Sequence, residues 1–256
     1  MNAAVLSVTA LAGFPTVRAG DDLAALVLAA VATSGLVVET GDILVLAQKI
    51  VSKAEGRTVA LSAVESSDRA RELAAKADKD PRVVELILRE SVEVLRCRPG
   101  VIIVEDKRGF VMANAGIDAS NVETPDGEEA VLLLPEDPDA SAAHIRAAIA
   151  DCTGVEIGVV INDSFGRAWR MGTVGTAVGV AGIPALLDLR GRPDRNGRIL
   201  RTTDLGVADE VAAAASLMMG QAGEGRPAVL VRGFPYAAAG GSARDLVRPR
   251  IMDLFR

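Results

Sequence analysis

The sequence predicts an α+β fold in which helices and strands form mixed layers. Half of the 256 residues are hydrophobic and 24% are charged, which is the composition of a globular protein with a substantial core. Apolar, β-rich runs and helical stretches follow one another without the regular strand–helix repeat of a TIM barrel. The chain has no GxxxxGK[ST] motif, and its glycine-rich segment 219–226 follows a predicted helix and precedes a strand. A P-loop and a Rossmann fingerprint are therefore excluded.

The predicted helices have recognisable ends. Residues 23–34 follow an Asp-Asp pair that can cap the first turn and complement its dipole. Residues 66–79 have the charged pattern of an exposed helix, and residues 81–96 open with a proline, which is favoured at the first helical position. Residues 141–149 form an amphipathic pattern, and residues 209–220 are rich in alanine and end at a glycine.

The predicted strands are short and apolar. Residues 41–47 read as a buried strand that follows a turn. Residues 101–105 and 110–113 flank a glycine-containing turn and predict a hairpin. Residues 155–161 form a near-continuous apolar run that is typical of burial on both faces, and residues 228–232 form another.

No domain boundary is visible in the chain. Residues 125–129 and 192–197 have the composition of surface turns, and neither is a linker. We find no internal repeat and no low-complexity segment. The sequence therefore predicts one unit over residues 1–256.

Composition excludes several classes of function. Aromatic residues make up only 3% of the chain and the net charge is −6, which argues against binding of nucleic acid. The single histidine, His144, excludes a zinc site built on histidines. Cys97 and Cys152 are too few for a disulfide framework and are expected to be buried. Any bound metal must therefore have oxygen ligands, which suit Mg²⁺, Mn²⁺ or Ca²⁺.

The location of the protein follows from what its N-terminal region lacks. There is no basic segment of the kind that opens a signal peptide. The longest apolar stretch in this region, residues 23–32, is shorter than the ~20 residues that span a bilayer. We therefore expect a cytoplasmic protein without a membrane partner.

A first polar segment, residues 114–121, follows a predicted strand. It contains Asp118 and Asn121, three residues apart, so that one turn could direct both side chains at one ligand. Asp, Ser and Asn also favour Asx turns that cap the next element. From the local residues alone, such a turn is the better interpretation of Asp118.

A second polar segment, residues 161–170, follows the predicted buried strand. Asp163 and Ser164 lie directly after that strand, where open α/β sheets commonly place ligand sites. A carboxylate beside a hydroxyl suits a hard cation that also binds phosphate. Arg167 and Arg170 add guanidinium groups suited to carboxylate or phosphate. A helix N-cap at Asp163 is the alternative, and the density of polar groups favours the ligand site.

Two further segments have weaker signals. The glycines of residues 219–226 can let the backbone approach a ligand and expose its N–H groups to phosphate, although a helix C-cap and a loop explain them equally well. Lys53 follows a strand and can meet a phosphate as a point charge, although single lysines usually lie on the surface.

Together these segments resemble the coenzyme F420-0: γ-L-glutamyl ligase family. The resemblance spans nearly the whole chain in the family's order. It is carried by residues 49–57, 115–122, 162–167, 208–210, 219–221 and 227–233. It implies a stand-alone ligase that uses GTP and two divalent cations, Mg²⁺ or Mn²⁺, and allows for K⁺ as a further cation. The implied reaction attaches L-glutamate to F420-0 through an acyl phosphate, and a second glutamate can follow through a γ-linkage.

The resemblance also implies a fold and a set of site residues. The fold is a family-specific one of two intertwined subdomains in a homodimer, and the sequence does not mark their boundaries. Asp118 and Asp163 would bind the first metal, Ser164 and Gln221 the second, and Lys53 would act with the two aspartates in catalysis. The residues implied for nucleotide binding are Leu11, Ala12, Gly13, Phe14, Gln48, Lys53, Asn121, Met219, Gly220, Gln221, Ala222, Gly223, Glu224, Gly225 and Arg226.

Three positions depart from the family pattern, and the roles of two arginines stay open. Gln48 stands where relatives often have a hydroxyl residue, Ser164 where they often have Thr, and Gln221 where some have Glu. Arg167 and Arg170 are candidates for holding a substrate carboxylate. Because the matching segments handle the nucleotide, a related ligase that acts on a different carboxylate metabolite is the alternative function.

Overall fold

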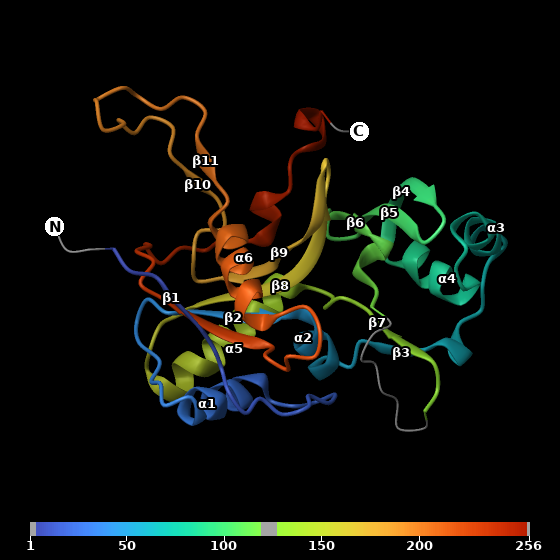
Figure 1. Ribbon diagram of the computed structural model, residues 1–256, viewed down its shortest axis with the longest axis horizontal. Helices are drawn as coiled ribbons and strands as arrows, with labels where there is room; N and C mark the ends of the chain where they lie inside the picture. The colour runs from blue at the N-terminus through green and yellow to red at the C-terminus, as the bar shows by residue number, and fades with distance from the viewer. Residues whose placement is uncertain (1–3, 119–126, 255–256) are drawn as a thin grey trace.

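The computed structural model describes residues 4–118 and 127–254 and confirms an α+β architecture without a closed barrel (Figure 1). The α-helices are α1 (Leu23–Thr33), α2 (Gln48–Ala54), α3 (Asp68–Ala77), α4 (Pro81–Arg89), α5 (Pro138–Thr153) and α6 (Val207–Met219). The strands are β1 (Ser7–Ala10), β2 (Ile43–Ala47), β3 (Thr58–Ala60), β4 (Ser91–Arg98), β5 (Val101–Asp106), β6 (Val111–Ala113), β7 (Ala130–Leu132), β8 (Gly158–Arg167), β9 (Arg170–Ala181), β10 (Leu187–Asp188), β11 (Asp204–Leu205) and β12 (Ala228–Arg232).

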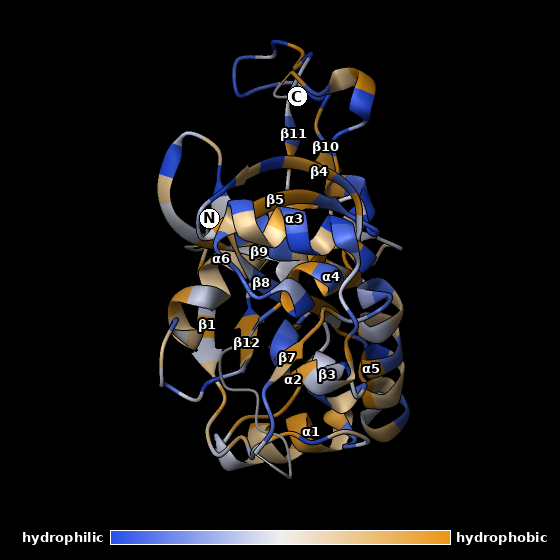
Figure 2. Ribbon diagram, turned by 90° about the vertical axis from the view of Figure 1, so that its right-hand side faces the viewer, coloured by the Kyte–Doolittle hydropathy of each residue, from blue (hydrophilic) through white to orange (hydrophobic). Residues whose placement is uncertain are grey.

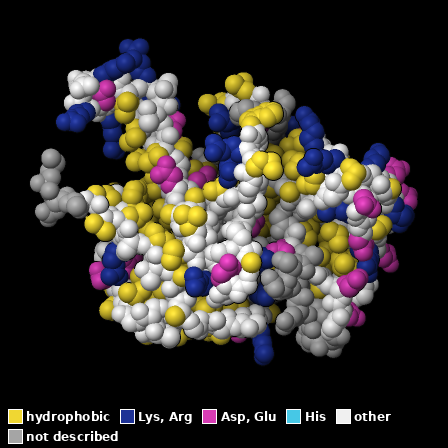
Figure 3. Space-filling view, viewed as in Figure 1, with side chains coloured by type: hydrophobic (Ala, Val, Ile, Leu, Met, Phe, Trp, Pro, Cys, Tyr) yellow, Lys and Arg dark blue, Asp and Glu magenta, His cyan; other side chains and the backbone are white. Residues whose placement is uncertain are grey.

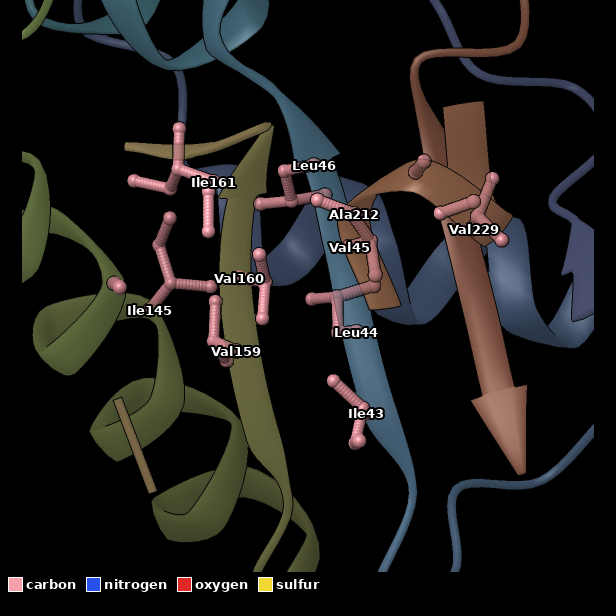
Figure 4. Close-up of a cluster of buried hydrophobic side chains, with 14 of the residues drawn as sticks. Ile43, Leu44, Val45, Leu46, Ile145, Val159, Val160, Ile161, Ala212 and Val229 are labelled. Atoms are coloured by element: carbon pink, nitrogen blue, oxygen red, sulfur yellow. The ribbon is translucent and has the colours of Figure 1, made fainter. Parts of the chain in front are cut away.

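The central sheet has the strand order β1-β12-β2-β8-β9, and only its β2–β8 pair is parallel. Helix α6 packs on one face, and α5 with α1 covers the other (Figure 2). Burial on both faces explains why β2 is apolar throughout. Figure 4 shows Ile145 of α5 beside Val159 and Ile161 of β8. These contacts form the main hydrophobic core.

A second, smaller group of elements lies beside this sheet (Figure 1). Helices α3 and α4 pack against the antiparallel sheet β4-β5-β6 around a core of their own, and β3 pairs with β7. Phe110, just before β6, packs edge-on against Phe165 of β8, with ring centroids 6.1 Å apart. This contact joins the smaller group to the strand that carries the candidate site.

The hairpin β10–β11 continues into a long loop that projects from the body of the protein (Figure 1). Residues 192–197 lie at its exposed tip, as predicted for a surface turn. Arginine side chains, drawn dark blue, cover much of this loop in the space-filling view (Figure 3).

Several predicted elements are confirmed. Asp22 caps α1 by accepting a hydrogen bond from the Ala25 N–H, and Pro81 opens α4. The β5–β6 hairpin turns at Gly109, whose φ of +93° is accessible to glycine. The helix predicted around His144 is α5, and His144 is exposed on it.

Other predictions were wrong. The helix expected over residues 81–96 ends at Arg89, because residues 91–98 form strand β4, which pairs with β5. Strands β1, β3, β7, β9, β10 and β11 were not predicted at all. Cys97 and Cys152, expected to be buried, are both exposed. Cys97 lies on the edge strand β4, and Cys152 in the last turn of α5.

One ion pair ties β12 to the turn before β2. Arg232 donates to both carboxylate oxygens of Asp42, at 2.7 and 2.8 Å, and the Asp42 side chain is only 1% exposed. Replacing Arg232 by Met leaves this carboxylate buried without its cation. We expect the free energy of unfolding to fall by about 2 kcal/mol, since one partner of the pair is partly solvated.

Chemical denaturation followed by circular dichroism measures this change. The matched control is Arg250→Met, because Arg250 pairs with Glu93 on the surface and should contribute less than about 1 kcal/mol. Equal losses of stability in the two variants would contradict the assigned role of Arg232.

Candidate active site

A cavity of about 590 Å³ lies where the far end of β8 meets the start of α2 and the loop after α6. Five stretches of the chain, distant in sequence, line it. They are residues 14–17, residues 47–50 with Lys53, residues 112–118 in part, residues 162–166, and residues 219–227 in part. The cavity therefore gathers most of the polar segments that the sequence singled out.

Strand β8 carries the central residues of the cavity. The sequence predicted a strand that ends at Ile161, with Asp163 after it as a ligand or a helix N-cap, but β8 runs on to Arg167 and pairs with β9 throughout. Successive side chains of a strand point to opposite faces. Asp163 therefore lies toward Asp118, whereas Ser164 lies toward the end of α6.

Asp118 and Asp163 come together in the cavity. Asp118 pairs with Leu132 in an isolated β-bridge, which fixes its backbone, and Asp163 projects from β8. Burial raises the pKa of Asp163 to about 6; the Ser164 N–H lowers it, the negative charge of Asp118 raises it further, and Lys49 lowers it. The two carboxylates are thus close enough to interact, and a cation between them would relieve their repulsion.

Ser164 and Gln221 form a second pair of oxygen groups. The Ser164 hydroxyl donates to the Gln221 side-chain oxygen at 2.9 Å. Gln221 follows α6 directly, so the end of this helix sets the position of its side chain.

The donor set fits hard divalent cations. The four side chains offer only oxygen ligands, which Mg²⁺ and Mn²⁺ prefer. Within the described residues, no group of three or more His, Cys, Asp or Glu side chains is placed to hold a metal. Two carboxylates alone leave most positions around a cation open, which is the usual situation where Mg²⁺ also binds substrate phosphates.

A family model described as F420-0:Gamma-glutamyl ligase matches residues 13–233. The chain belongs to this family. The segments that carry its resemblance to the F420-0:gamma-glutamyl ligases include residues 49–57, 162–167 and 219–221, all of which contribute to the cavity.

Individual relatives match over most of their length. The chain is 47% identical over 253 residues to the coenzyme F420:L-glutamate ligase of Methanothermobacter thermautotrophicus, which covers 98% of this chain and 99% of the relative. It is 45% identical over 219 residues to the enzyme of the same name from Methanocaldococcus jannaschii, covering 86% of each chain. It is also 45% identical over 244 residues to the coenzyme F420:L-glutamate ligase of Methanopyrus kandleri, which covers 94% of this chain and 93% of the relative.

The residues that the F420-0:gamma-glutamyl ligase resemblance assigns to the nucleotide fall into two groups. Those that line the main cavity are Phe14, Gln48, Lys53, Met219, Gly220, Gln221, Ala222, Gly225 and Arg226. A neighbouring hollow of about 560 Å³ is lined by Leu11, Ala12, Gly13 and Glu224, and it shares Gly225 and Arg226 with the main cavity. Gly223 lines neither space, and Asn121 lies outside the described residues.

The loop after α6 is folded back on itself. Gly220 has a φ of +77°, and an added Cβ there would lie 2.2 Å from Cδ of Glu224. The Glu224 carboxylate accepts the Ala222 N–H at 2.8 Å, and this bond lowers the pKa of Glu224. The loop thus binds one of its own carboxylates through the backbone groups that could bind a phosphate.

The candidates for a substrate carboxylate lie elsewhere. Arg167 and Arg170 flank the turn between β8 and β9, and neither lines the cavity. Arg167 donates to the Met171 carbonyl at 3.1 Å, and Arg170 is exposed.

The structure adds two polar residues that sequence reasoning missed. Lys49, in the first turn of α2, lies with its Nζ 2.5 Å from Oδ2 of Asp118. Asn162 is buried on β8 and donates to Sδ of Met219 at 3.5 Å, which links the strand to the end of α6. The spacing of Lys49 and Lys53, one helical turn apart, was the one local signal for Lys49.

None of the helices within the described ranges has the length and hydrophobicity that a bilayer span requires.

Proposed function

We propose that this protein is a GTP-dependent ligase that joins the amine of L-glutamate to the terminal carboxylate of coenzyme F420-0, and that can add a second, γ-linked glutamate. The observation that carries the proposal is the meeting of Asp118, Asp163 and the Ser164–Gln221 pair in one cavity. The name of the family supplies the acceptor F420-0, and the names of the relatives supply L-glutamate. The proposed cofactors are two divalent cations, Mg²⁺ or Mn²⁺, with room for K⁺, and the proposed assembly is a cytoplasmic homodimer.

The reaction runs in two steps. A carboxylate oxygen of F420-0 attacks the γ-phosphorus of GTP, the bond to the β–γ bridging oxygen breaks, and GDP leaves. The glutamate amine then attacks the acyl carbon, the bond from that carbon to the phosphate oxygen breaks, and phosphate leaves as the amine loses a proton. Asp118 and Asp163 would hold one cation, and Ser164 and Gln221 the other. When bound, these cations offset the phosphate charge that repels an incoming carboxylate.

The chain's own residues then bind and orient the reactants. Lys53 lies half-buried on α2 and lines the cavity, so it can reach a terminal phosphate as a point charge. The loop after α6 presents backbone N–H groups to the nucleotide once Glu224 releases them.

The test is one incubation of purified protein with F420-0, GTP, Mn²⁺ and L-glutamate, read by mass spectrometry. We expect F420-0 to gain one glutamate residue, or two, with GDP formed in step, and we expect neither product when GTP is left out. If metal and GTP bind but F420-0 stays unmodified, the acceptor is wrong, and the ligase acts on a different carboxylate metabolite.

A further inference from the structure

Lys49 is placed at the centre of the candidate site, although no role follows for it from the reaction. Its Nζ lies 2.5 Å from Oδ2 of Asp118, and the two side chains are 36% and 24% exposed. Its charge also acts on Asp163, as does that of Asp118. An ammonium group therefore stands beside the two carboxylates that are proposed to hold a metal.

The ammonium and a metal compete for the same place. A carboxylate oxygen binds a divalent cation with the lone pairs that it offers to an ammonium hydrogen. A singly charged and a doubly charged cation on one carboxylate also repel each other strongly in a partly buried site. A metal bound at Asp118 therefore weakens the ion pair with Lys49 and favours the release of the lysine.

The fold gives Lys49 another partner within reach. Residues 49 and 53 lie one turn apart on α2, so their side chains share a face of the helix, and both line the cavity. Lys53 is proposed to meet the phosphates of the nucleotide. A lysine released from Asp118 can turn along the same face and add a second positive charge to the same phosphates.

We propose that Lys49 is a positioning residue that holds Asp118 in the metal-free protein and passes to the nucleotide phosphates when metal binds. The proposal rests on the function proposed above. It makes the bindings of metal and nucleotide interdependent: metal frees Lys49 for the phosphates, and the phosphates keep Lys49 away from the metal ligands. By linkage, each ligand then raises the affinity for the other by the same factor.

The test compares the wild type with Lys49→Met, which keeps an unbranched side chain one atom shorter and removes the charge. Isothermal titration calorimetry measures the affinity for Mn²⁺ with and without a non-hydrolysable GTP analogue, and the affinity for the analogue with and without Mn²⁺. We expect Lys49→Met to bind Mn²⁺ alone roughly tenfold more tightly and the analogue with Mn²⁺ more weakly. The coupling factor should fall to the part that direct contact between the cations and the phosphates supplies.

The matched control is Lys76→Met, an exposed lysine of α3 outside the cavity, which should leave all affinities unchanged. If Lys49→Met binds Mn²⁺ alone no better than the wild type, the exchange is overturned while the proposed function stands. If the wild type binds neither Mn²⁺ nor the analogue, the proposed function itself fails. Lys49→Gln replaces Lys49→Met, with the same expected changes, if the latter does not give the wild-type circular dichroism spectrum.

Discussion

Asp163→Asn is expected to lower turnover by roughly 100-fold or more while making the metal-free protein more stable. The loss of activity follows because an amide cannot supply the negative charge that the proposed cation site needs. The gain in stability follows because the folded chain holds the Asp163 carboxylate in a desolvated position beside Asp118, with its pKa raised to about 6. Asn can still accept the Ser164 N–H, so the local geometry is kept.

The pH dependence of this gain has a definite sign. The folded protein takes up a proton on Asp163 near pH 6, whereas the unfolded chain does so near the ordinary value of 3.8. The penalty for a charged Asp163 is therefore present above pH 6 and disappears as the pH falls toward 4. The variant should exceed the wild type by roughly 1–2 kcal/mol at pH 7.5, allowing for partial solvation, and by almost nothing at pH 4.

Denaturation of chelator-treated protein at the two pH values measures the gain, and the glutamate-transfer assay measures the loss. Asp151→Asn, on an exposed position of α5, is the matched control and should change neither. Wild-type turnover in Asp163→Asn would remove Asp163 from the site, and an unchanged stability at pH 7.5 would show that its carboxylate is well solvated.

Gly175→Ala is expected to destabilise the protein by about 3 kcal/mol. Gly175 lies on β9 where α6 crosses the sheet, and an added Cβ would lie 2.4 Å from the Ala212 carbonyl oxygen and 2.6 Å from Oδ1 of Asn162. The first of these atoms is backbone, so α6 would have to move. Met219 ends α6 and Gln221 lies in the loop that follows, so such a shift should also weaken metal binding.

A thermal melt should show a fall of roughly 6–12 °C for Gly175→Ala. Gly166→Ala is the control, because Gly166 lies on the same hairpin and an added Cβ there meets no atom within 4 Å. Both glycines have ordinary φ values, which leaves the crowding at α6 as the difference between them. Equal melting temperatures for the two variants would refute close packing of α6 on β9.

Elements that depend on local signals could be predicted from the sequence, whereas strand β9 could not, because its glycines are required by long-range contacts. Helix α1, the β5–β6 hairpin and β2 depend on caps, turns and apolar runs that are local, and all were found. Strand β9 was missed because its glycines lower the β-propensity. Gly175 and Gly179 are there because α6 and α5 approach the strand at those two points, and such contacts are not visible along the chain.

In the candidate site, too, local signals could be read from the sequence, and contacts made only on folding could not. The polar character of residues 162–167 was correctly noticed, but it suggested that the strand ends at Ile161, whereas pairing with β9 keeps the segment extended to Arg167. Nothing local distinguished Asp118 from a turn residue, and only the family resemblance selected it. Lys49 could not be found from its neighbours, because its partner Asp118 comes from a part of the chain that only folding brings near.

The position of β12 in the central sheet has a consequence for synthesis on the ribosome. This strand lies between β1 and β2, although it is made long after both. Until residues 228–232 emerge from the exit tunnel, β1 has no neighbour and one edge of β2 stays open. The nascent chain must therefore keep an apolar strand edge unpaired through most of translation, which is the state that chaperones bind and that associates with other chains when they are absent.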